Sequence, residues 1–153
     1  MSRWKKIVLF LLLVFIGIQF IRPARNISGQ AVPADITKLY SVPAHVQAIL
    51  KTSCYDCHSN NTQYPWYANV QPAGWLLAKH VKDGKAALNF NEFGNYTQRR
   101  QLNKLRSIAS QVKDGEMPLQ SYTWIHQDAK LSAAGKTLII DWVTRTRDSL
   151  EAN

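Results

Sequence analysis

Apolar positions divide the chain into one continuous apolar run and a longer part with helical periodicity. The run covers residues 7–21, IVLFLLLVFIGIQFI, and contains no charged side chain. In the longer part, apolar residues recur in four segments at intervals of three and four residues, which is the spacing of one face of an α-helix. No segment alternates apolar and polar residues for long enough to predict a β-strand. The pattern therefore predicts an all-α domain behind a separate apolar segment.

Two of the predicted helices lie in the first half of the domain. One begins at Pro43, because proline is favoured in the first turn of a helix, and it should continue through the two cysteines. Its apolar face would contain Val46, Ile49, Leu50, Ser53, Cys54 and Cys57. The second is expected to run from Pro72 to Asp83 and to stop at Gly84. Residues 87–96, ALNFNEFGNY, should form a loop or a brief extended segment.

The other two predicted helices form the C-terminal half. One covers Thr97–Asp114 and ends at Gly115, a residue typical of helix ends. Its apolar stripe would contain Leu102, Leu105, Ala109 and Val112. The other follows Ser132 and ends near Leu150. Its inward face would contain Leu138, Ile139, Trp142 and Val143.

The chain is expected to have three parts: an N-terminal membrane anchor or signal segment (1–25), a tether and lead-in (26–42) and one domain (43–153). Three basic residues precede the apolar run, as in an export signal. The run has 15 residues, whereas a transmembrane helix needs roughly 20. The match to a cleavage site near Ala24 is poor. We therefore expect an anchor in the inner membrane that faces the periplasm, with a cleaved signal and a soluble periplasmic protein as the alternative.

The formal net charge of +9 does not predict a nucleic-acid partner. Five of the 19 basic residues flank the apolar run, so residues 26–153 carry 14 basic and 10 acidic side chains. That part contains no dense block of Lys and Arg, which an electrostatic nucleic-acid interface would need. A solvated surface of mixed charge accounts for the composition.

The sequence CYDCH, residues 54–58, contains the only two cysteines of the chain and a histidine directly after the second. A structural zinc site would need four ligands, and there is no second cysteine pair. A thioredoxin-type pair would lie near a βαβ pattern, which is missing, and a disulfide would close a very short loop. Covalent haem attachment uses all three residues, because the two thiols add to the haem vinyl groups and the histidine binds the iron. We therefore predict one haem c, bound by Cys54, Cys57 and His58. This attachment follows export, which agrees with the N-terminal segment.

The second axial ligand of the iron is predicted to be Met117, the only internal methionine. It lies 59 residues after His58 in the polar stretch DGEMPLQSY, where a side chain that only fills the core is not needed. His80 is the alternative ligand. His45 and His126 are expected to be surface or hydrogen-bonding residues.

Aromatic residues follow the motif closely: Tyr64, Trp66, Tyr67 and Trp75. They could form the apolar wall that a haem needs, or an ordinary helical core. Metal-bound histidines usually donate their second ring N–H to a fixed acceptor. For His58 we expect that acceptor to be Pro65 or another nearby backbone carbonyl.

Three stretches resemble the bacterial haem-binding domain family related to c-type cytochromes: CYDCHSNNTQYPWYANVQPAGWLLAKHVKDGKAALNF, EMPLQSYTWIH and LSAAGKTLIIDWV. They span nearly the whole domain, and CxxCHSxxTxxPWY with a later MP pair is far more specific than CxxCH alone. The resemblance implies a small exported protein with a cytochrome c-like helical bundle. It also implies haem thioethers at Cys54 and Cys57, proximal ligation by His58, and Met117 at the position of the MP motif. Gly135 departs from the acidic residue expected after the LS pair, which bears on the start of the last helix.

These observations predict a monohaem c-type cytochrome domain that transfers single electrons to and from redox partner proteins and is not an enzyme. One alternative is a small peroxidase-like haem enzyme with an open distal site, in which His80 would act as acid and base. The other is a haem-based sensor, in which Met117 leaves the iron to admit a ligand. The sulfur-to-iron band in the far red and the binding of carbon monoxide would distinguish them.

Overall fold

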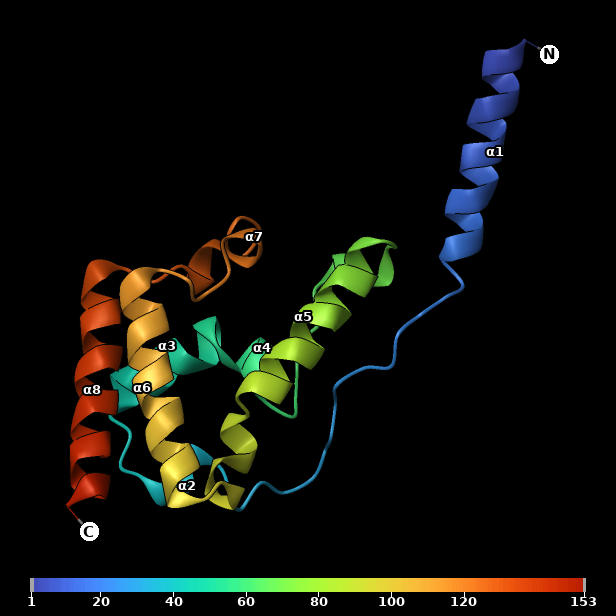
Figure 1. Cartoon of the computed structure of the whole chain (residues 1–153). Helices are drawn as coiled ribbons and strands as arrows, with labels where there is room; N and C mark the ends of the chain where they lie inside the picture. Colours follow the sequence, from blue (N-terminus) through green and yellow to red (C-terminus); the bar gives the residue numbers. More distant parts are fainter. Residues whose placement is uncertain (1, 153) are drawn as a thin grey trace.

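The computed structural model describes residues 2–152, which fold into helices and connecting turns (Figure 1). The helices are α1 (Arg3–Ile18), α2 (Ile36–Leu39), α3 (Ala44–Ser53), α4 (Tyr55–His58), α5 (Ala73–Ala87), α6 (Gln98–Asp114), α7 (Gln120–Thr123) and α8 (Ala133–Glu151). Three 3-10 turns join them: η1 (Trp66–Asn69), η2 (Phe90–Asn95) and η3 (Gln127–Ala129). Within residues 2–152 no β-strand forms. The all-α prediction is therefore confirmed.

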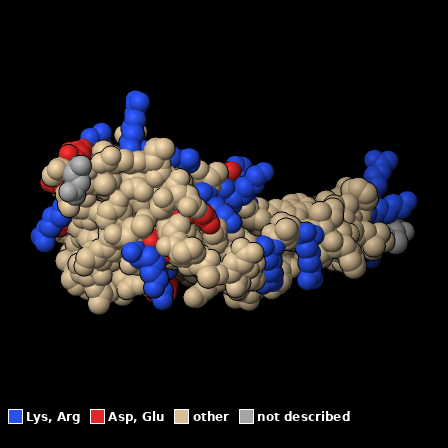
Figure 2. Space-filling model, turned by 90° about the horizontal axis from the view of Figure 1, so that it is seen from below, with Lys and Arg blue, Asp and Glu red and all other residues tan. Residues whose placement is uncertain are grey.

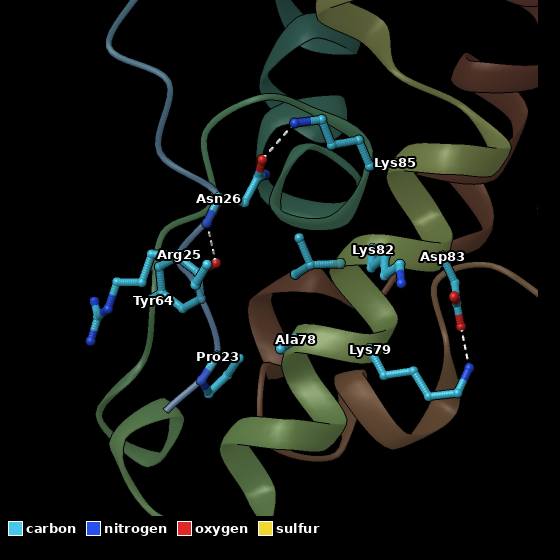
Figure 3. Close-up of a pocket in the computed structure, with 11 residues that line it drawn as sticks. Pro23, Arg25, Asn26, Tyr64, Ala78, Lys79, Lys82, Asp83 and Lys85 are labelled. Atoms are coloured by element: carbon cyan, nitrogen blue, oxygen red, sulfur yellow. Dashed lines mark hydrogen bonds and ion pairs between the residues drawn. The ribbon is translucent and has the colours of Figure 1, made fainter. Parts of the chain in front are cut away.

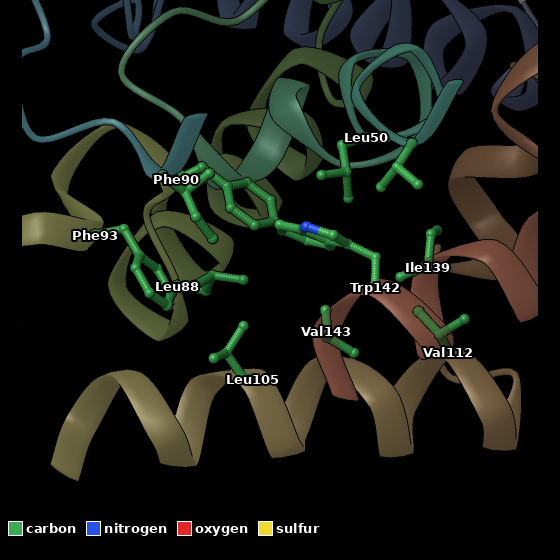
Figure 4. Packing of buried hydrophobic residues seen from close by; sticks show 11 residues of the cluster. Leu50, Leu88, Phe90, Phe93, Leu105, Val112, Ile139, Trp142 and Val143 are labelled. Carbon is green, nitrogen blue, oxygen red and sulfur yellow. The ribbon is translucent and has the colours of Figure 1, made fainter. Parts of the chain in front are cut away.

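The core lies where α6 and α8 pack side by side, with α3 and η2 closing it (Figures 1 and 4). Figure 4 shows Leu105 and Val112 rising from α6 towards Val143 and Trp142 of α8. Full burial of one such side chain contributes roughly 1.5–3 kcal/mol. The buried cluster consists of Ile36, Val46, Leu50, Leu88, Phe90, Phe93, Leu105, Val112, Ile139, Trp142 and Val143.

The limits of the two C-terminal helices agree with the prediction. The Thr97 side chain accepts a hydrogen bond from the Arg100 N–H at 3.4 Å, and Gly115 ends α6 with a φ of +76°. The Ser132 hydroxyl accepts one from the Gly135 N–H at 3.0 Å and caps α8. A Cβ at position 135 would lie 3.3 Å from that hydroxyl oxygen, so a glycine lets the cap close tightly.

One predicted core residue of α8 is at the surface. Leu138 is 37% exposed, whereas Ile139, Trp142 and Val143 are buried. The helix presents a single face to α6 and α3, and Leu138 lies beside that face. The spacing of apolar residues alone did not show that Leu138 lies at the margin of the buried face of α8.

Two predicted helix limits near the cysteines are wrong. The backbone leaves the helical conformation at Cys54 (φ −129°, ψ −39°), so α3 ends at Ser53 and the motif lies on the separate helix α4. Helix α5 continues through Gly84 to Ala87. A Cβ at Gly84 would lie 3.0 Å from both the Cβ and the carbonyl oxygen of Cys57. The glycine therefore lets α5 approach α4 closely and does not end the helix.

Helix α1 contains most of the apolar run and contributes nothing to the core. Its large apolar side chains from Ile7 to Ile16 are 44–64% exposed. Among residues 2–152, no helix has the length and apolarity needed to cross a membrane, so the predicted transmembrane helix is not supported. In Figure 1, α1 stands apart from the bundle.

Residues 26–42, expected to be a tether and lead-in, pack against the domain. The Asn26 side chain donates a hydrogen bond to the Ser59 carbonyl at 2.9 Å. Helix α2 lies on η2, and Ile36 is completely buried. This segment therefore supplies part of the core and covers the backbone that follows the motif.

Candidate functional site

The two thiols lie on the tight turn between α3 and α4. Neither cysteine is bridged in a disulfide, and both are half-buried. Burial and the neighbouring Cys57 raise the pKa of Cys54 to about 12. Burial and the Asp56 charge raise the pKa of Cys57 to about 11. Both groups are therefore neutral thiols near pH 7, unlike the thiolates of redox-active cysteine pairs.

The orientation of His58 is fixed by a contact across the fold. Its Nδ1 lies 3.1 Å from the carbonyl oxygen of Leu88, just after the end of α5. A carbonyl oxygen only accepts hydrogen bonds, so Nδ1 holds the proton and Nε2 keeps its lone pair for a metal. Burial lowers the pKa of His58, although the hydrogen bond to Leu88 opposes this. We expected a backbone carbonyl to accept the Nδ1 proton, and the structure has the carbonyl of Leu88 in this place and not that of Pro65.

Helix α5 supports the motif from one side. Gly84 is in contact with Cys57, and His80 lies one helical turn earlier and is half-buried. The structure thus brings the helix of His80 to the motif. Among residues 2–152, the His80 ring has no hydrogen-bond partner that would fix its orientation.

A buried polar network holds the segment that contains Leu88. The Asn60 N–H donates to Asn91 Oδ1, and Asn89 Nδ2 donates to Asn60 Oδ1, both at 2.8 Å. Asn91 Nδ2 donates to Asp35 Oδ2 at 2.5 Å, and Asp35 is only 5% exposed. The network ties the residues after the motif to the residues after Leu88. Sequence reasoning missed it, although the repeated asparagines of HSNN and LNFNEFGN were a signal.

Met117 lies in the loop that leaves α6. Its backbone N–H donates to the Gln111 carbonyl at 3.2 Å, and its side chain is half-buried. The loop continues into α7, where the Tyr122 hydroxyl donates to Asp56 Oδ2 at 2.6 Å. Because Asp56 is part of the CxxCH motif, this bond brings the loop of Met117 against the motif.

Tyr67 and His126 form a second contact between this loop and the motif's surroundings. The Tyr67 hydroxyl lies 2.8 Å from His126 Nε2, and the His126 ring stacks on Tyr122 with centroids 4.2 Å apart. Burial raises the pKa of Tyr67, and burial with the Asp56 hydrogen bond raises that of Tyr122. Both phenols therefore keep their protons. His126 is a hydrogen-bonding residue, as predicted, whereas Tyr122 was missed.

The other predicted aromatic residues do not line a common wall. Tyr64 accepts a hydrogen bond from the Asn26 N–H at 2.7 Å, and the Trp75 indole donates to the Ile21 carbonyl at 2.8 Å. Tyr64 thus binds the start of the lead-in, and Trp75 binds the N-terminal segment. Trp66 is 77% exposed and belongs to the surface.

Two surface cavities lie away from the motif. The larger, about 640 Å³, lies between residues 23–26 and α5 (Figure 3). Two of the cations that line it have partners, since Lys79 pairs with Asp83 and Lys85 donates to Asn26 Oδ1. The second, about 520 Å³, lies between the lead-in and α8. On the face shown in Figure 2, Lys and Arg are spread out, with Asp and Glu among them.

Comparison with known proteins gives one match. A family model described as a haem-binding domain matches residues 13–145. No curated protein and no solved structure matches the chain. Among residues 2–152, no three side chains of His, Cys, Asp or Glu are grouped so that they could hold a bare metal ion.

Proposed function

The chain belongs to the haem-binding domain family, and from this premise we propose that it is a monohaem c-type cytochrome domain that transfers single electrons. The residues of the motif fit a covalently attached haem. They offer two unbridged thiols and an imidazole whose Nε2 has no proton, because Nδ1 holds the proton and donates it to the Leu88 carbonyl. When bound, the haem supplies a one-electron couple at its iron.

The hydrogen bond between His58 and Leu88 is the observation that carries the proposal. A histidine that binds iron needs an unprotonated Nε2 and a fixed ring, and a bond from Nδ1 to a backbone carbonyl supplies both. The Asn60–Asn89–Asn91 network holds the Leu88 segment in place, and the Phe90 ring lies edge-on to the imidazole at 6.3 Å. These residues hold Nε2 in one direction before any iron is bound.

We propose Met117 as the ligand on the opposite face. Support comes from its position as the only internal methionine and from the contact of its loop with Asp56. Methionine ligation favours the reduced iron and raises the potential. If His58 and Met117 both held the iron, no open position would remain for a substrate, so we propose an electron carrier and not an enzyme.

We further propose that the N-terminal segment directs export, so that the haem is attached on the periplasmic side of the inner membrane and redox proteins there are the partners. The support is the basic start before the apolar run and the exposure of that run on α1.

The covalent link is tested by denaturing electrophoresis followed by a haem-peroxidase stain. We expect a stained band near the mass of the chain, and loss of the stain in the Cys54→Ser, Cys57→Ser double variant. The variant should still be detected by protein stain, which serves as the loading control. If acidified organic solvent extracts the haem from the unaltered protein, the thioether assignment is wrong.

A further inference from the structure

The loop that contains Met117 is held mainly by polar contacts. No residue of α7 is buried, and Trp124 and Ile125 beside it are 71% and 62% exposed. Apolar burial therefore does little to place this part of the chain. The loop is anchored at its start, where the Met117 N–H binds the Gln111 carbonyl, and at its end, where Ala129 is buried.

Between these anchors, one hydrogen bond joins the loop to the CxxCH motif and a second joins it to η1, while a ring stack ties the two loop residues to each other. The Tyr122 hydroxyl donates to Asp56 Oδ2 at 2.6 Å. The His126 ring stacks on Tyr122 with an angle of 10° between the planes, and its Nε2 lies 2.8 Å from the Tyr67 hydroxyl. Asp56 stands between the two cysteines of the motif, whereas Tyr67 belongs to η1, so one contact ends on the motif itself and the other on the segment that follows it.

We propose that Tyr122 and His126, with their partners Asp56 and Tyr67, form a latch that keeps Met117 on the haem iron. The proposal rests on the proposed function, in which Met117 is the sixth ligand. Tyr122 and His126 are positioning residues, since they act through the loop and not on the iron.

The latch matters because a thioether ligand competes with every other molecule that can bind iron. A loop that is free between its anchors loses conformational entropy each time its sulfur binds. A loop already fastened has lost most of that entropy in advance, so the same sulfur binds more firmly. The Tyr122–Asp56 bond is the stronger part, because its acceptor is a carboxylate.

The test uses the haem-loaded, full-length protein and the variant Tyr122→Phe, which removes the hydroxyl and keeps the ring stacked on His126. We expect the affinity of the reduced protein for carbon monoxide to rise about tenfold or more, the effect of losing one hydrogen bond to a charged acceptor. The far-red sulfur-to-iron band of the oxidised protein should weaken. The matched control is Tyr40→Phe, which removes a hydroxyl bonded to Gln101 Oε1 at 2.6 Å in another part of the fold and should change neither signal.

The Met117→Ala background separates the latch from the proposed function. There, Tyr122→Phe should have no further effect on carbon monoxide affinity, because the latch acts only through Met117. If Tyr122→Phe raised carbon monoxide affinity equally with and without Met117, Tyr122 would affect the haem site by another route, and the latch would be refuted. If Met117→Ala opens the site but Tyr122→Phe does not, the latch is refuted and Met117 ligation stands. If Met117→Ala itself changes nothing, the ligand assignment fails and the latch fails with it.

A second variant covers the case in which Tyr122→Phe does not fold. Tyr67→Phe breaks only the contact with His126 and leaves the bond to Asp56. We expect a smaller rise in carbon monoxide affinity in the same direction. An affinity equal to that of the unaltered protein would then overturn the proposal.

Discussion

At the scale of single residues, the distance of 3.1 Å between His58 Nδ1 and the Leu88 carbonyl oxygen decides which ring nitrogen can bind iron. Burial lowers the pKa of His58 and so favours the neutral imidazole that a metal requires. The two thiols are neutral for the same reason. The two thiols and the imidazole that would hold the haem are thus uncharged near neutral pH, and Asp56 is the charged neighbour of the motif.

The ligand opposite His58 is tested by Met117→Ala. A methyl group cannot bind iron, so the sixth position should open and carbon monoxide should bind to the reduced protein. The reduction potential should fall, because axial ligands tune haem potentials over roughly 0.8 V and a thioether favours reduced iron. A redox titration with a carbon monoxide difference spectrum measures both effects. The haem stain should persist, since Cys54 and Cys57 are unchanged.

The rival ligand gives the opposite pattern. With His80 on the iron, Met117→Ala would leave the spectrum unchanged and His80→Ala would alter it. Ready binding of carbon monoxide by the unaltered reduced protein would mean that neither residue closes the site. The enzyme or sensor hypothesis would then replace electron transfer.

The sequence predicted the site residues that are adjacent along the chain. It did not predict those that meet the motif only after folding. Cys54, Cys57 and His58 lie within five positions, and their spacing alone predicts haem attachment. Leu88 acts through a backbone carbonyl, so no side chain marks it. Tyr122 binds Asp56 across 66 positions of the chain, and only the fold brings them together.

At the scale of elements, the packing of α5 on α4 overrides a local signal. Glycine commonly ends helices, but Gly84 lies inside α5 because a larger residue would collide with Cys57. The break at Cys54 is a second case, since α3 ends there and the motif continues on the separate helix α4. Periodicity identified α6 and α8 well, because both are long and capped by their own residues. It failed where tertiary contacts determine the backbone.

The close packing of α5 on α4 at Gly84 and Cys57 is tested by the variant Gly84→Ala. The added Cβ would lie 3.0 Å from two atoms of Cys57, so α5 must shift. Overpacking of this kind typically costs about 1–3 kcal/mol, and we expect that loss in the free energy of unfolding of the haem-loaded protein in urea. Gly17→Ala is the matched control, because no atom lies within 4 Å of its added Cβ. An unchanged stability of Gly84→Ala would show that the contact is not tight in solution.

At the scale of the whole molecule, more than half of the net charge lies beside the apolar run and not on the domain. The domain has a mixed surface (Figure 2), and five basic residues flank the apolar run. The helical class and the single domain follow from periodicity and length. The sequence did not predict how the N-terminal part meets the domain, because that contact depends on polar side chains in a segment that resembles a flexible tether.

Contacts at the end of α1 bear on whether residues 1–25 are cleaved from the mature protein. The Gln19 side chain accepts from the Gln71 N–H at 2.8 Å and donates to the Gln71 carbonyl at 3.2 Å. Gln71 is completely buried, so removal of Gln19 would leave two backbone groups without these partners. We therefore expect the mature protein to keep the apolar run and to fractionate with membranes, since lipid can cover the exposed apolar side chains of α1.

The intact mass of the protein purified from its native cells measures this directly. A mass that includes residues 7–21, found in the membrane fraction, is the expected result. Residues 26–153 released by a protease site placed after Arg25 should be soluble, because the apolar run is then gone. A native chain that begins near residue 25 in the soluble periplasmic fraction would show a cleaved signal. The haem site would be unaffected, because its ligands and their hydrogen-bond partners all lie beyond the cut.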